Sequence, residues 1–322
     1  MQQFQLAIIA GLIVAGLSVW ATIVRRLIRR ESIISFEPRS RVPWTGFDVL
    51  LLVLALPMVD ALVIVLTQTR LTLTSGEISF ELLSAITAAH MMWSGLAIIY
   101  LEQRTGASAD EIGFNLDHLA NDARVGVLAF LAAFLAVYGT ENLVVTFLPA
   151  TEHPLAKLVR EQFNPALMTL AAISAVFVAP LTEELVFRVI LQGWLEKQID
   201  LLGEHGRLAW EPVARWVPVL VSSAAFAAMH QGYERIPIFA LGLFLGYLYH
   251  QTHRIFPSLF LHATFNGLTV LFLLISGTAA PEPPVSPLPV EPVAAPSVAS
   301  SGFSIRSSSQ PSTVPHVGEW TP

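Results

Sequence analysis

The chain contains no cysteine and few charged residues. Of its 322 residues, 13% are Asp, Glu, Lys or Arg, and 54% are hydrophobic. Without cysteine the protein has no disulfide, no thiolate metal ligand and no cysteine nucleophile. A soluble domain usually carries about 25% charged residues. This chain has too few charges to cover a soluble surface, so its composition predicts a protein that is solvated by lipid.

The sequence also lacks a basic excess and a signal-peptide pattern. Its formal net charge is -6, which gives no indication of a nucleic-acid partner. Residues 4–24 carry no charge, and the arginines of residues 25–30 come after this stretch. A cleaved signal peptide would place its basic residues first. We therefore interpret this stretch as a first transmembrane helix.

Eight apolar stretches follow one another along the chain. They cover residues 4–24, 47–67, 80–101, 125–148, 166–187, 217–230, 236–250 and 255–276. Several reach the roughly 20 residues that a membrane span needs. The sixth and seventh are short, so these segments could be tilted, broken or partly re-entrant. The pattern predicts an all-α, polytopic transmembrane bundle of about eight spans.

The positions of the basic residues suggest an orientation. With the N-terminus outside and eight alternating spans, 13 of the 18 Lys and Arg residues fall in inside segments and five in outside segments. Cytoplasmic loops are enriched in these residues. The bias favours an even number of spans with both termini outside.

Composition and motifs divide the chain into three parts. Residues 1–150 hold N-terminal spans and loops, and residues 151–277 hold the expected functional core. Ten of the 21 prolines lie between Pro281 and Pro322. Residues 278–322 are therefore predicted to be a disordered tail rich in proline and serine.

Ionisable residues inside the spans are candidates for function, because each costs about 2.5–3.5 kcal/mol at the centre of a span. Several have structural explanations: they are Asp48, Glu81 and Glu141 near span ends, Asp60 and His90 within the bundle, and His250 and His253 at an interface. The remaining residues form three motifs.

The first motif contains Glu183, Glu184 and Arg188. On a helix, Glu184 and Arg188 are four residues apart and can pair on one face. Glu183 is rotated by about 100° and lacks this arginine as a partner. A carboxylate of this kind can act as a general base near neutral pH. The structural alternative is a pair of acidic residues at an interface.

The second and third motifs supply imidazoles and an amide. His230 ends a run of small and apolar residues, and small residues allow helices to approach closely. His262 and Asn266 are four residues apart in the last apolar stretch. They could stabilise an oxyanion, or the imidazole could ligate a metal. Interfacial exposure of His230 and helix–helix hydrogen bonding by His262 and Asn266 are the structural alternatives. Together the motifs suffice to activate water and stabilise a tetrahedral intermediate.

These motifs, in this order, resemble those of the CAAX protease and bacteriocin-processing (CPBP, or Abi) intramembrane peptidases. The resemblance covers roughly residues 165–276 and includes Phe226 four residues before His230. The family commonly has glycine after the motif arginine, where this chain has Val189. This difference could alter helix approach but removes no catalytic group.

The resemblance implies an intramembrane endopeptidase that acts on a membrane-associated protein or peptide. Glu183 would activate water with His230, while His262 and Asn266 would hold the oxyanion or complete the polar site. Glu184 and Arg188 would form a supporting pair. The family is usually described as metalloproteases, so a divalent metal such as zinc could bind Glu183, His230 and His262. A metal-free site is the alternative.

Two other functions use the same polar residues. A non-catalytic immunity or scaffold protein would share every motif. A proton-coupled transporter would also place carboxylates and histidines in its spans, but it more often shows repeats with broken helices in both halves. The expected location is the plasma (inner) membrane of a bacterium, with the site nearer the cytoplasmic side.

Overall fold

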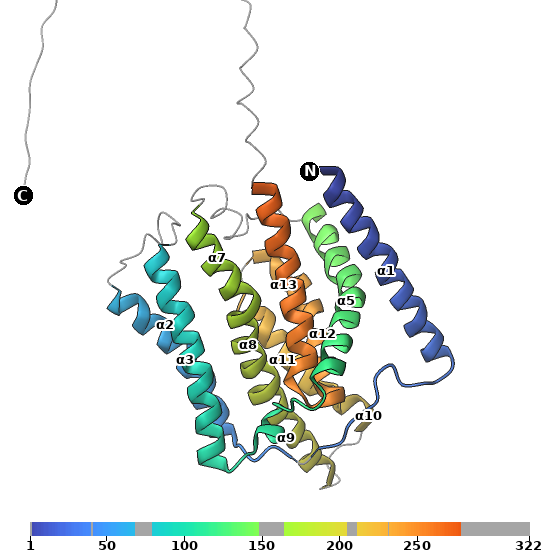
Figure 1. The fold of residues 1–322 in the computed structure, drawn as a ribbon. Coiled ribbons are helices and arrows are strands. Elements are labelled where there is room, and N and C mark those ends of the chain that lie inside the picture. The colour runs from blue at the N-terminus through green and yellow to red at the C-terminus, as the bar shows by residue number, and fades with distance from the viewer. Residues whose placement is uncertain are drawn as a thin grey trace, which may run out of the picture. The chain divides into compact units, whose positions relative to one another are not determined.

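The computed structural model describes residues 2–39, 41–67, 79–147, 164–204, 211–230 and 232–277 (Figure 1). All regular secondary structure within these ranges is helical, which confirms the predicted fold class. The predicted tail, residues 278–322, and the predicted boundary at residue 150 lie outside the described residues.

Within the described ranges, six helical segments are long and apolar enough to cross a membrane. They are α1 (Gln2–Ile28), α2 (Gly46–Leu66), α3 (Phe80–Thr105), α5 (Leu119–Phe147), the α7–α9 segment (Pro165–Glu204) and α13 (Ile255–Gly277). The buried share of the most apolar window is 6% in α1 and 11% in α2. A soluble protein does not expose apolar surface on this scale, so the protein is a multi-pass integral membrane protein.

The prediction of about eight spans is too high for the described residues. The sixth and seventh apolar stretches form α11 (Val217–Ala228) and α12 (Arg235–Thr252), joined by the 3₁₀ turn η3 (Gly232–Glu234). The 12 residues of α11 rise only about 18 Å, less than the roughly 30 Å hydrocarbon core. The two helices pack against each other as a hairpin. Within the described residues the fold thus has six candidate spans and one helical hairpin.

The α7–α9 segment is interrupted by two π-helical stretches. In order it contains α7 (Pro165–Ile173), π-helix η1 (Ser174–Val178), α8 (Ala179–Glu184), π-helix η2 (Leu185–Gln192) and α9 (Gly193–Glu204). Single π-helical turns occur often at functional sites. The apolar pattern predicted a helix over residues 166–187 but gave no sign of these interruptions.

Helix α13 packs against α5, α12, α8 and η1 near the middle of the bundle (Figure 1). A Cβ atom on Gly126 of α5 would lie 2.6 Å from both the Pro257 carbonyl oxygen and the Phe260 Cβ atom. The two backbones therefore meet closely, because Gly126 has no side chain. This contact lies one turn before His262.

A buried ion pair fixes the start of α13. Arg254 donates from Nε and Nη2 to the Asp122 carboxylate at 2.9 and 2.8 Å, and it also pairs with Glu37. Burial alone would lower the pKa of Arg254, but hydrogen bonds and the charges of Asp122 and Glu37 raise it above its ordinary value. The guanidinium therefore holds α5 and the residues before α2 against the beginning of α13.

We predict that Gly126→Ala destabilises the bundle. The new methyl group must separate α5 from α13, and overpacking of this kind costs about 1–3 kcal/mol. Thermal unfolding of the purified protein in detergent measures the change. Gly139→Ala is the matched control in α5, because its Cβ atom would meet nothing within 4 Å. Equal melting temperatures for Gly126→Ala and the unmodified protein would contradict the proposed close approach.

Candidate intramembrane active site

Helix α8 places its two adjacent glutamates in different surroundings. Glu184 Oε2 lies 3.4 Å from Arg188 Nε, and both side chains are at most 1% exposed. The ion pair expected from the four-residue spacing is therefore present and buried. The Glu183 side chain is 28% exposed. It is the more accessible carboxylate of the two. Adjacent residues point about 100° apart on a helix, so the two side chains reach different surroundings.

His262 lies between the two carboxylates. Its Nδ1 atom is 2.9 Å from Glu184 Oε1, and its Nε2 atom is 3.5 Å from Glu183 Oε2. The first distance is a hydrogen bond, whereas the second is longer than hydrogen bonds usually are. When Nδ1 donates its proton to Glu184, the ring is oriented and its Nε2 lone pair faces Glu183. Glu184 thus holds both Arg188 and His262.

His230 approaches the same site from the end of α11. Its Nδ1 atom lies 3.0 Å from the Phe226 carbonyl oxygen, which leaves Nε2 as its second ring nitrogen. The Phe226 ring packs edge to face against His230 at 5.1 Å and against His262 at 5.6 Å. The Arg188 guanidinium lies 5.3 Å from the same ring. Phe226 therefore connects two of the predicted histidines to the buried ion pair.

Asn266 serves the backbone of η1. Its Nδ2 atom donates to the Ala175 carbonyl oxygen at 2.8 Å. In this π-helix the Ala179 N–H donates to the Ser174 carbonyl, five residues back. By the same spacing the Ala175 carbonyl would accept from residue 180, but Pro180 has no N–H. Asn266 supplies the hydrogen bond that Ala175 cannot obtain from its own helix, so one N–H of the predicted oxyanion donor is already engaged.

Two polar residues from the N-terminal spans also reach this region. His90 Nε2 lies 2.7 Å from Asp60 Oδ1, so these residues pair with each other. Ser94, one turn after His90 on α3, lies 3.0 Å from Thr182, the residue before Glu183. Sequence reasoning identified His90 as an interior, hydrogen-bonded histidine but did not pair it with Asp60.

The residues expected to hold a metal have suitable chemistry but do not form a close cluster. Metal-ligating histidines usually have their other ring nitrogen hydrogen-bonded. His262 and His230 both meet this condition through Nδ1. In the part of the chain that the structure describes, however, the one group with three potential ligand atoms within 4.8 Å is Glu196, His250 and His253. Glu183, His230 and His262 are not such a group.

The fold and the site together define a helical membrane protein with an oriented carboxylate–imidazole site inside its bundle. Residues 165–268, which carry all three motifs, match the family model described as type II CAAX prenyl endopeptidase Rce1-like. The resemblance to CAAX-type membrane proteases that the motifs predict is therefore confirmed for this segment.

A curated relative gives the same result. The chain is 32% identical over 103 residues to the "Membrane-embedded CAAX protease MroQ" of Staphylococcus aureus (strain USA300). The match covers 32% of this chain and 38% of the relative. The similarity thus spans well under half of either protein. No solved structure matches the chain.

We predict that Arg188→Met destabilises the protein by about 3–5 kcal/mol, because it leaves the Glu184 carboxylate buried without its cation. Glu183→Gln should cause a much smaller change, since this side chain is partly exposed and does not pair with Arg188. Thermal or denaturant unfolding in detergent measures both variants. If Arg188→Met unfolded no more readily than Glu183→Gln, the assignment of Glu184 and Arg188 as the structural pair would be wrong.

Proposed function

We propose that the protein is an intramembrane endopeptidase that hydrolyses peptide bonds of a membrane-associated protein or peptide. The observation that supports this function best is the different use of two adjacent carboxylates. Glu184 is engaged by Arg188 and His262. Glu183 has no such pair of hydrogen-bonding partners, is partly exposed and faces His262 Nε2. This arrangement suits a base that needs an oriented neighbour and access to water.

In the proposed reaction, Glu183 removes a proton from water as the water attacks the scissile carbonyl carbon. His230, whose Nε2 is the ring nitrogen not engaged by the Phe226 carbonyl, assists this proton transfer. The tetrahedral intermediate collapses when the protonated Glu183 carboxyl gives this proton to the leaving amine. His262 is positioned to stabilise negative charge when it carries a proton on Nε2. Such charge stabilisation and general acid–base transfer are the largest contributions that side chains make to hydrolysis.

The contacts of Asn266 and Glu184 support positioning roles. Asn266 holds the η1 backbone through Ala175. Glu184 fixes the His262 ring through Nδ1. We therefore propose that Asn266 completes the polar site by holding η1 and α13 together. Its second amide N–H could also donate to the oxyanion.

A divalent metal is compatible with the donor set. Glu183, His230 and His262 would hold it, and the metal would supply Lewis-acid polarisation of the scissile carbonyl. The residue roles above describe the metal-free site, because a bound metal would engage the same three side chains.

The proposed location is a bacterial plasma membrane with the site nearer the cytoplasmic side. The distribution of Lys and Arg supports the orientation, and the Staphylococcus aureus relative supports the bacterial setting. We propose membrane-associated polypeptides as the substrate class. The relative matches only part of this chain, so its own substrate is not assigned to this protein.

We predict that Glu183→Gln lowers peptide-bond hydrolysis by about 10²–10⁴-fold, the usual contribution of a general base. Cells that lack the gene would express the unmodified protein or the variant at matched levels. Quantitative mass spectrometry would then compare newly formed peptide termini in their membranes. Glu81→Gln is the control, because it removes an exposed carboxylate from α3.

The expected result is a set of termini that requires the unmodified protein, persists in Glu81→Gln and disappears in Glu183→Gln. If the same termini appeared at undiminished levels in Glu183→Gln, Glu183 would not be the base. If the unmodified protein produced no new termini, the scaffold interpretation would be favoured.

A further inference from the structure

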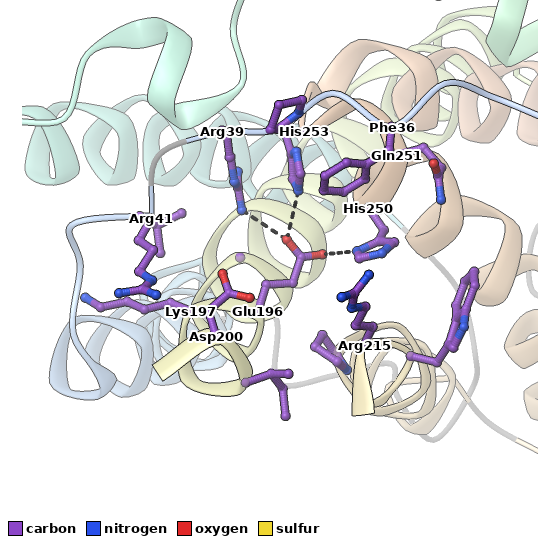
Figure 2. A pocket seen from close by; sticks show the side chains of 16 residues that line it. Phe36, Arg39, Arg41, Glu196, Lys197, Asp200, Arg215, His250, Gln251 and His253 are labelled. Atoms are coloured by element: carbon purple, nitrogen blue, oxygen red, sulfur yellow. Dashed lines mark hydrogen bonds and ion pairs between the residues drawn. The ribbon is translucent and has the colours of Figure 1, made fainter. Parts of the chain in front are cut away.

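A second polar cluster lies at the far end of the α7–α9 segment. Glu196 of α9 is twelve residues after Glu184, about 18 Å along a helix. It meets His250, near the end of α12, and His253, which follows α12 (Figure 2). All three side chains are between 9% and 14% exposed. Sequence reasoning expected both histidines at an interface and did not single out Glu196.

The two imidazoles approach opposite oxygens of one carboxylate. His250 Nδ1 lies 3.0 Å from Glu196 Oε1, and His253 Nε2 lies 3.3 Å from Glu196 Oε2, as the dashed lines in Figure 2 show. One ligand atom from each residue lies within 4.8 Å of the other two. Ligand atoms bound at about 2.0–2.2 Å around one zinc ion would have similar separations.

The orientation of His253 is set by the backbone of another segment. Its Nδ1 atom is 2.6 Å from the Glu37 carbonyl oxygen and donates a proton to it. In a neutral ring the Nε2 lone pair then points toward a carboxylate oxygen, so either a proton on Nε2 or a bound metal ion must lie between the two atoms. A carbonyl-anchored Nδ1 is the usual arrangement behind a histidine that binds metal through Nε2.

The backbone of His253 ends α12. Its φ angle is 50°, in the left-handed region that often follows a helix, and its N–H donates to the Tyr249 carbonyl oxygen. This cap fixes the point from which the imidazole leaves the chain.

Outer hydrogen bonds hold the carboxylate in place. Gln192 Nε2 donates to Glu196 Oε1 at 3.1 Å, and Arg39 Nη2 donates to Oε2 at 3.3 Å. Arg39 also donates to the Tyr249 hydroxyl at 2.6 Å. Ligating carboxylates are commonly supported in this way.

The cluster lines a cavity of about 630 Å³, which provides an entry path and room for a further ligand (Figure 2). The cavity is also lined by Arg41, Lys197 and Arg215. Asp200 lines it as well. Hard cations such as Mg²⁺ and Ca²⁺ prefer several oxygen ligands, which this cluster does not offer. Two imidazoles and one carboxylate instead suit a first-row divalent transition metal.

We propose that Glu196, His250 and His253 form a binding site for one divalent transition metal, with zinc as the representative ion. The ligand atoms are a Glu196 carboxylate oxygen, His250 Nδ1 and His253 Nε2, and the remaining position opens to the cavity. The metal fastens α9 to the end of α12 and, through Glu37 and Arg39, to the segment before α2. This site shares no residue with the Glu183 site.

The test uses the full-length protein in detergent, stripped with a chelator and then titrated with Zn²⁺ or with Co²⁺ as a spectroscopic probe. Metal content per chain is measured after removal of unbound ions. The decisive variant is His253→Gly, because glycine preserves the left-handed backbone while it removes the imidazole. His250→Gln is the second ligand variant. His118→Ala, which removes an exposed histidine elsewhere, is the control.

The expected result is one tightly bound Zn²⁺ that is retained in His118→Ala, Glu183→Gln and His262→Ala. Zinc binding should weaken at least tenfold in His253→Gly and in His250→Gln, since even loss of an outer partner costs about 10–100-fold. The visible absorption of bound Co²⁺ should be lost in the same two variants.

Three results would overturn the proposal. If the stripped protein bound no Zn²⁺, or if His253→Gly bound it equally well, the three residues would be joined by hydrogen bonds alone. If zinc were lost only in Glu183→Gln and His262→Ala, the metal would belong to the candidate active site. None of these results would decide the peptidase proposal, because its readout is the formation of peptide termini.

Discussion

The buried ion pair between Glu184 and Arg188 is the interaction on which the rest of the site depends. Two opposite charges without solvent need further hydrogen bonds to offset the cost of their desolvation. Glu184 meets part of this need by accepting from His262 across to α13. Arg188 does so by donating to Ser222 of α11 and packing over Phe226. Neutralising one carboxylate in this way joins three helices and leaves its neighbour, Glu183, available for chemistry.

The same helix continues this polar arrangement toward its other end. Glu184, Arg188, Gln192 and Glu196 follow at intervals of four residues. Ser222 accepts from Arg188 and donates to Gln192 at 2.9 Å, and Gln192 donates to Glu196. Gly246 makes room for this contact, since a Cβ atom there would lie 3.0 Å from Gln192 Oε1. One ion pair and three hydrogen bonds in a row therefore connect the candidate active site with the Glu196 cluster.

The π-helical stretches on either side of α8 explain why distant residues are needed. In η1 the Ala175 carbonyl faces the position of Pro180, which cannot donate, and Asn266 of α13 provides the donor. This local irregularity of the segment is thus compensated by the helix that also carries His262. Close approach at Gly126 and the Arg254–Asp122 pair hold that helix in place.

The sequence by itself determined the features that depend on composition or on neighbouring residues. These are the helical membrane fold, the order of the motifs and the pairing of Glu184 with Arg188, which one helix turn brings together.

Tertiary structure decided the rest: six spans and a hairpin in the described residues, the contact of His262 with both glutamates, the Asp60–His90 pair and the Glu196 cluster. Glu196 and His253 are 57 positions apart, and His90 and Asp60 lie on different helices. Apolar periodicity shows that a segment is helical, but it does not specify which helices pack together. Contacts between their polar residues follow only from that packing.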